Sequence, residues 1–151
     1  MNDPVQIRAL LEKEGMVLST SVGVSMWPML RNRRDTVLIH PLKGRLKKYD
    51  VALYTRNGQL ILHRVLRVWP DGYDIRGDNC LGLEKNVSED CMLGVLAGFW
   101  RGERKVNMSG LGYRLYVRLW CFVFPVRALL KRLRGRLMGF AARIWRNKTK
   151  N

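Results

Sequence analysis

The spacing of hydrophobic residues changes along the chain and divides it into segments of different predicted structure. In residues 1–15 the apolar positions recur at three- and four-residue intervals, which is the spacing of one face of an α-helix. In residues 16–102 they form short runs broken by Gly, Asp and Asn, as in β-strands joined by turns. Residues 103–112 include the glycine-punctuated run Asn107-Met108-Ser109-Gly110-Leu111-Gly112 and are predicted to be a linker. Residues 113–151 return to helical spacing and are predicted to form a helical tail.

The β-domain is predicted from strand-like segments and two turn signals. Asn57-Gly58 is a tight-hairpin signal because both residues tolerate positive φ, and Asp71-Gly72 marks a second turn. The segments that read as strands are 37–39, 51–54, 60–68, 73–76 and 93–100. Many short strands joined by polar turns predict a mainly β fold that is compact and mostly antiparallel. A short helix precedes this fold, with Asp3 and Pro4 suited to its first turn.

The tail combines an apolar stripe with a strong positive charge. Residues 101–151 hold 14 basic residues and one acidic residue, and so supply most of the net charge of +16. Pro125 is predicted to start or kink the tail helix. The arginines fall outside the stripe, whose members are Val126, Leu129, Leu130, Leu133, Leu137, Phe140, Ala141 and Ile144.

A basic helix with an apolar face suits the surface of an anionic membrane. Residues 113–146 are therefore predicted to bind such a surface, helped by the amphipathic rings of Tyr113, Tyr116, Trp120 and Trp145. The alternative is a helix packed on the β-domain with its arginines in solvent. Nucleic acid is a disfavoured partner, because a bulky apolar stripe is out of place in a basic nucleic-acid-binding arm.

Cysteine usage and the N-terminal residues restrict the class of protein further. Cys80, Cys91 and Cys121 are odd in number and irregularly spaced, which argues against a disulfide framework, and no CxxC pair or histidine cluster indicates a metal site. We predict no metal and no cofactor. Residues 1–15 lack the apolar core of a signal peptide, and no charge-free apolar run reaches about 18 residues. The predicted location is the cytoplasm or the periphery of a membrane, without a cleavable signal peptide.

Three short segments could together support nucleophilic catalysis. Ser25 follows Gly23, which tolerates unusual φ, at a turn that could expose a hydroxyl nucleophile. His63 lies in an alternating strand and could serve as its base, whereas His40 looks peripheral. Asp78 could orient the imidazole. Each also has an ordinary explanation as a loop serine, a packed strand histidine or a Gly-Asp-Asn turn.

In their order along residues 17–100, these segments resemble the superfamily that joins type I signal peptidases to the self-cleaving SOS-response repressors. A histidine directly before an arginine is the form of the base found in the endoplasmic-reticulum and archaeal-like signal peptidases. One departure is Arg34, where the family usually has glycine. The segments that carry the resemblance are Gly23 with Ser25, Met26 and Pro28; Asp35-Thr36-Val37; Lys47 to Val51; His63-Arg64-Val65; Gly77-Asp78-Asn79; and Leu93-Gly94-Val95.

The resemblance implies a signal-peptidase-like serine endopeptidase that processes a peptide or protein precursor through an acyl-enzyme. Ser25 would be the nucleophile, His63 the general base and Asp78 its orienting carboxylate. Backbone N–H groups near Gly23 and Ser25 would bind the oxyanion. Met26, Trp27 and Pro28 are the residues predicted to line the substrate groove. The family's N-terminal membrane anchor and the repressors' DNA-binding domain have no counterpart here, which favours a stand-alone processing peptidase.

Two other classes remain open at this stage. A catalytically silent module could keep the β-fold and bind peptides or a membrane. A self-cleaving regulator would need a scissile segment that can reach Ser25, and the one Ala-Gly pair, Ala97-Gly98, lies in a predicted core strand.

Overall fold

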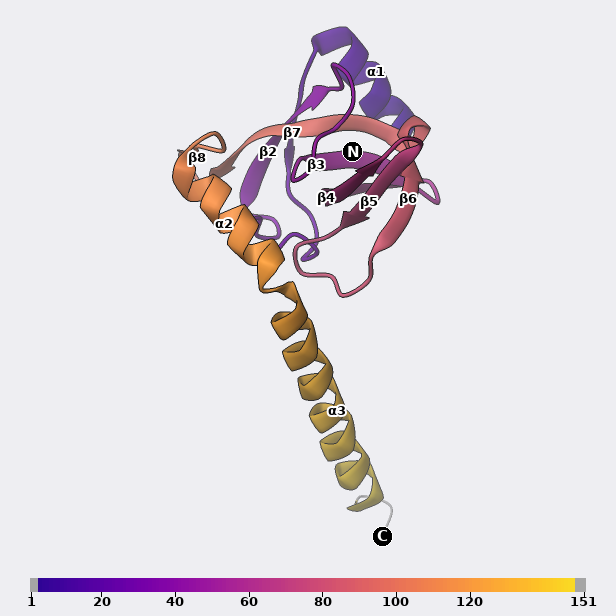
Figure 1. Cartoon of the computed structure of the whole chain (residues 1–151), viewed down its shortest axis with the longest axis vertical. Helices are drawn as coiled ribbons and strands as arrows, with labels where there is room; N and C mark the ends of the chain where they lie inside the picture. The colour runs from indigo at the N-terminus through magenta and orange to yellow at the C-terminus, as the bar shows by residue number, and fades with distance from the viewer. Residues whose placement is uncertain (1–2, 149–151) are drawn as a thin grey trace. The chain divides into compact units, whose positions relative to one another are not determined.

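The computed structural model describes residues 3–148, with side chains for residues 3–136 and 138, and it confirms a mainly β fold with an N-terminal helix and a helical tail (Figure 1). The chain divides into two compact units, residues 1–114 and 115–151. In the first unit the elements are α1 (Pro4–Glu14), β1 (Val17–Thr20), β2 (Asp35–Pro41), β3 (Val51–Arg56), β4 (Gln59–Trp69), β5 (Gly72–Arg76), β6 (Glu84–Ser88), a 3-10 turn (Glu89–Cys91), β7 (Met92–Arg101) and β8 (Arg104–Val106).

The strands form one antiparallel sheet in the order β1-β2-β7-β3-β4-β5-β6, with β8 paired to β7. The long strand β7 pairs with β2 along one part of its length and with β3 along another. Register shifts interrupt four of the strand pairs, and bulges of this kind increase the local twist. The result is a strongly curled sheet (Figure 1).

The hairpin between β3 and β4 forms where the sequence predicted it. Asn57 and Gly58 both have positive φ, 52° and 73°, and the pairing runs from Arg56 opposite Gln59 to Val51 opposite Arg64. This register places Ala52 opposite His63. The side chains of both residues therefore point to the same face of the sheet.

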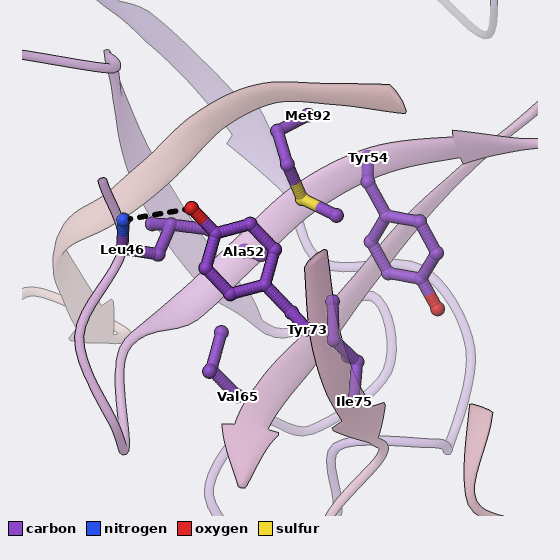
Figure 2. Close-up of a cluster of buried hydrophobic side chains, with 7 residues drawn as sticks. All are labelled: Leu46, Ala52, Tyr54, Val65, Tyr73, Ile75 and Met92. Atoms are coloured by element: carbon purple, nitrogen blue, oxygen red, sulfur yellow. Dashed lines mark hydrogen bonds between the residues drawn. The ribbon is translucent and has the colours of Figure 1, made fainter. Parts of the chain in front are cut away.

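A cluster of buried side chains fills the curl of the sheet around β3, β4 and β5 (Figure 2). Its two tyrosines have polar ends that are satisfied in different ways. The Tyr73 hydroxyl accepts a hydrogen bond from the backbone N–H of Leu46 at 3.2 Å. The Tyr54 hydroxyl points away from the apolar cluster (Figure 2). The members are Leu46, Ala52, Tyr54, Val65, Tyr73, Ile75 and Met92.

Helix α1 begins where its sequence predicts and has a capping residue at each end. The Asp3 side chain accepts a hydrogen bond from the N–H of Val5, and Gly15 ends the helix in the left-handed conformation. Ile7 and Leu11 are buried where α1 packs on β1, β2 and β7. The helix therefore covers the end of the sheet that β1, β2 and β7 form.

The five predicted strands correspond to β2, β3, β4, β5 and β7. Residues 103–112, which were predicted to be a linker, contain the short strand β8. Gly102, with φ 62°, allows a tight turn that folds β8 back on β7, and Lys105 packs over the Trp100 ring at 5.4 Å. A three-residue strand with two basic residues carries too little hydrophobic pattern to be recognised from sequence.

The second unit is helical. Helix α2 (Leu111–Phe122) begins in the first unit and continues into the second. Helix α3 (Phe124–Lys148) starts one residue before Pro125, as the sequence predicted. The side chains of Leu137, Phe140, Ala141, Ile144 and Trp145, which were part of the sequence prediction, lie outside the described residues. Within residues 3–148, no helix has both the length and the apolar character that crossing a membrane requires.

Candidate active site

Ser25 lies on a tight loop between β1 and β2. Gly23 precedes it with φ 95°, a conformation that L side chains rarely adopt, so this glycine is needed for the turn as predicted. The N–H of Trp27 donates to the carbonyl of Val24, and the N–H of Leu30 donates to the carbonyl of Met26. These bonds wind the chain through a helix-like turn directly after Ser25.

The base of this loop is anchored by Asp35, whose side chain is fully buried. Its carboxylate accepts hydrogen bonds from the backbone N–H of Arg31 at 2.9 Å and from Nε of Arg34 at 2.6 Å. Burial acts to raise the pKa of Asp35, but these hydrogen bonds outweigh it and hold the pKa below its usual value. The carboxylate is thus ionised at neutral pH and holds the end of the loop that leads into β2. The backbone carbonyl of Asp35 accepts from the N–H of Ser21 at 2.8 Å and ties this end to the start of the loop.

The Gly77-Asp78-Asn79 turn holds the other side of the loop. The backbone N–H of Asn79 donates to the carbonyl of Ser25 at 2.7 Å, and its side-chain amide donates to the carbonyl of Val24 at 3.1 Å. Two consecutive carbonyls beside Ser25 are therefore fixed by one asparagine. This leaves the neighbouring backbone with little freedom to rotate.

His63 on β4 has different surroundings at its two ring nitrogens. Nδ1 lies 3.2 Å from Oε1 of Glu84 and 3.1 Å from the hydroxyl of Tyr54, which itself donates to Glu84 at 2.8 Å. An ionised carboxylate can only accept, so it keeps a proton on Nδ1 and leaves Nε2 as the basic nitrogen. A Cβ built on Gly77 would lie 2.8 Å from Nε2 and 2.7 Å from the Ser25 carbonyl oxygen, so Nε2 is near the Ser25 loop.

Electrostatics at this histidine favour the neutral base. Burial lowers the pKa of His63 below its ordinary value of 6.5, although the carboxylates of Glu84 and Asp78 act in the opposite direction. Arg56 adds to the lowering and pairs with Glu84 at 2.8 Å. Burial and the contact with Glu84 raise the pKa of Tyr54, which therefore stays protonated and able to donate.

Ser25 and His63 line the same groove, which has a volume of about 410 Å³. Its walls come from β1 and the Ser25 loop on one side and from the β3–β4 hairpin on the other. β1 is an edge strand of the sheet. Neither the hydroxyl nor the backbone N–H of Ser25 makes a hydrogen bond with any residue that the structure describes, so both are available to a bound molecule.

Arg64, the residue after His63, connects β4 to the two loops of the site through buried hydrogen bonds. It is fully buried and donates from Nε and Nη2 to both carboxylate oxygens of Asp78, at 2.8 and 2.7 Å. It also donates to the carbonyl of Tyr49 and to the sulfur of Met29, at 3.0 and 2.9 Å. One guanidinium thus joins β4 to the Gly77–Asn79 turn and to the Ser25 loop.

Two of the contacts in the structure differ from those that the sequence predicted. The carboxylate beside Nδ1 of His63 is that of Glu84, while Asp78 accepts from Arg64. The N–H of Gly23 donates to the Asn32 side chain at 2.9 Å, so Gly23 shapes the turn without offering that N–H to an oxyanion.

The predicted groove residues also separate. Met26 lines the groove, whereas Trp27 and Pro28 lie outside its lining and the Trp27 side chain is 47% exposed. Consecutive residues in a helix-like turn point in different directions, so these three could not all face one groove.

Gly77→Ala is expected to disturb the site, because the new methyl group would lie within 2.8 Å of the Ser25 carbonyl oxygen, the Cys80 sulfur and Nε2 of His63. Overpacking of this kind costs about 1–3 kcal/mol of unfolding free energy. Urea denaturation followed by circular dichroism measures the loss. Gly82→Ala is the matched control, since its Cβ has no neighbour within 4 Å. Equal unfolding midpoints for the two variants would contradict the close packing at Gly77.

No protein-family model and no curated protein sequence matches this chain significantly.

Proposed function

We propose that the chain is a signal-peptidase-like serine endopeptidase that cleaves a peptide or protein precursor, with Ser25 as nucleophile and His63 as general base. One observation carries the proposal: Ser25 and His63 line the same groove, and Nδ1 of His63 contacts the carboxylate of Glu84. The fold class and the order of the sequence segments that resemble the superfamily support it independently.

The proposed mechanism follows from the different surroundings of the two ring nitrogens of His63. Nε2 of His63 accepts the hydroxyl proton of Ser25 while Oγ bonds to the scissile carbonyl carbon. The backbone N–H of Ser25 donates to the oxyanion. The tetrahedral intermediate then expels the amine, which takes the proton from Nε2, and leaves an ester on Ser25. Water hydrolyses this ester with His63 again as base, which restores the free hydroxyl.

Glu84 and Tyr54 act on this chemistry through His63 and are positioning residues. The ring must charge during the reaction, and Glu84 stabilises the imidazolium while fixing the tautomer. Arg56 neutralises part of the Glu84 charge through its 2.8 Å contact. The balance leaves the resting histidine neutral, because burial is the largest influence on its pKa and lowers it.

The pH dependence of cleavage tests this assignment. A base must be neutral to accept a proton, so kcat/KM is expected to decline as pH falls and His63 protonates, with a midpoint below the ordinary histidine pKa of 6.5. Arg56→Gln removes a positive charge that lowers the pKa of His63, so its acidic midpoint is expected to move to higher pH. The assay is mass spectrometry of a peptide library digested at a series of pH values.

The control for this shift is Arg67→Gln, an exposed arginine on β4, the strand of His63. It changes the net charge by the same amount and is expected to leave the midpoint where it is. A profile without an acidic decline, or a midpoint that moves equally in both variants, would exclude His63 as the base.

A further inference from the structure

The second unit presents a continuous stripe of exposed hydrophobic side chains. On α2 its members are Leu115, Leu119 and Phe122, and on α3 they are Val126, Leu129, Leu130 and Leu133. These side chains are between 44% and 81% exposed. Intervals of three, four and one residues keep them on one face of a helix with 3.6 residues per turn.

The junction between the two helices does not break this face. The N–H of Val123 donates to the carbonyl of Leu119, and the N–H of Arg127 donates to the carbonyl of Val123. Both are bonds between residues four apart, so the helical phase continues from α2 into α3. On the opposite face the Arg127 guanidinium packs on the Trp120 ring at 3.5 Å, which secures the junction.

Exposed arginines border the stripe on both sides. At 100° per residue, Arg118, Arg132 and Arg136 fall along one margin and Arg134 falls along the other. Residues 115–151 contain ten Lys and Arg residues and no Asp or Glu. The unit therefore offers an apolar centre with positive edges and no compensating negative charge.

We propose that this face binds the surface of a membrane that contains anionic lipid, with the helices lying in the plane of the headgroups. The apolar stripe would enter the acyl boundary while the flanking arginines meet lipid phosphates. Charge decides against a second copy of the chain, because two such faces would bring arginine margins together. It also decides against nucleic acid, since seven apolar side chains occupy the centre of the surface that phosphates would have to reach.

Co-sedimentation of the full chain with vesicles tests the proposal. Binding to vesicles of phosphatidylcholine with phosphatidylglycerol is expected to be at least about tenfold tighter than binding to phosphatidylcholine alone, because several basic residues meet the anionic surface. The variant Leu129→Glu/Leu133→Glu is expected to bind the anionic vesicles at least about tenfold more weakly than wild type. Measuring the Ser25→Ala protein as well keeps the result independent of peptidase activity.

The matched control is Val5→Glu/Leu81→Glu, which adds the same charge at two exposed apolar positions of the first unit. It is expected to bind the anionic vesicles nearly as tightly as wild type, because the stripe on α2 and α3 is unchanged. Equal loss in the two double variants, or equal binding to both kinds of vesicle, would overturn the proposal. So would a dimer in solution, or binding to duplex DNA, that the α3 variant abolishes while vesicle binding persists.

Discussion

Ser25→Ala is expected to abolish cleavage while the protein stays folded. The hydroxyl makes no hydrogen bond with the described residues, so its removal costs the fold little. It removes the one atom that forms the acyl-enzyme in the proposed mechanism, and losses on the order of 10⁴- to 10⁶-fold are typical when a nucleophile is removed. Comparison of protein N-termini by mass spectrometry, in cells producing either protein, measures the effect and identifies the substrate.

A second hydroxyl in the same groove supplies the control for this experiment. Ser19 on β1 also lines the groove, and Ser19→Ala changes the groove surface by the same single atom. It is expected to leave the set of new N-termini intact. Should wild type and Ser25→Ala yield the same N-termini, with both proteins folded and expressed, the peptidase proposal would give way to a silent peptide-binding module.

Self-cleavage is disfavoured by the position of the one Ala-Gly pair. Ala97 and Gly98 lie in the interior of β7, and Gly98 pairs with Leu38 of β2. On either side of Ala97, Leu96 pairs with Ile39 and Gly98 pairs with Leu38. To reach Ser25, this segment would have to break the pairing of β7 with β2. A peptide that approaches the groove from solvent beside the edge strand β1 meets no such barrier.

The sequence contained enough information to place Tyr54 near His63. The Asn57-Gly58 turn fixes the pairing of β3 with β4, so His63 lies opposite Ala52, and Tyr54 is a diagonal neighbour on the same face. The contact between the Tyr54 hydroxyl and His63 could therefore have been predicted from the sequence. The hydrophobic pattern alone predicts the two strands, whereas the pairing of Tyr54 with its neighbours depends on the register that the turn imposes.

Glu84 could not be identified in the same way. It lies on β6, a largely exposed strand with the sequence Glu-Lys-Asn-Val-Ser, which has no hydrophobic alternation to mark it. Its contact with His63 also depends on the register shift between Tyr73 and Ile75, where β5 pairs with β6. Bulges of this kind arise from tertiary packing and leave no local sequence signal. The resemblance of Gly77-Asp78-Asn79 therefore pointed to Asp78, while the carboxylate beside Nδ1 of His63 is that of Glu84.

Arg64→Met is expected to produce the largest loss of stability among substitutions outside the groove. The change removes both hydrogen bonds that Arg64 donates to the buried carboxylate of Asp78, together with its bonds to Tyr49 and Met29. Breaking one side of a buried ion pair costs about 3–5 kcal/mol, because the remaining charge stays in a poorly solvated site. Chemical denaturation measures the unfolding free energy of each variant.

Two further variants separate this buried pair from ordinary surface electrostatics. Adding Asp78→Asn to Arg64→Met removes the remaining charge, and the double variant is expected to be more stable than Arg64→Met alone. Lys13→Met breaks an exposed contact with Glu14 and is expected to change little. If Arg64→Met proved no more harmful than Lys13→Met, Arg64 could not be the connection between the Ser25 loop and the Gly77–Asn79 turn. The relative placement of Ser25 and His63 would then have to depend on Asn79 and Asp35 instead.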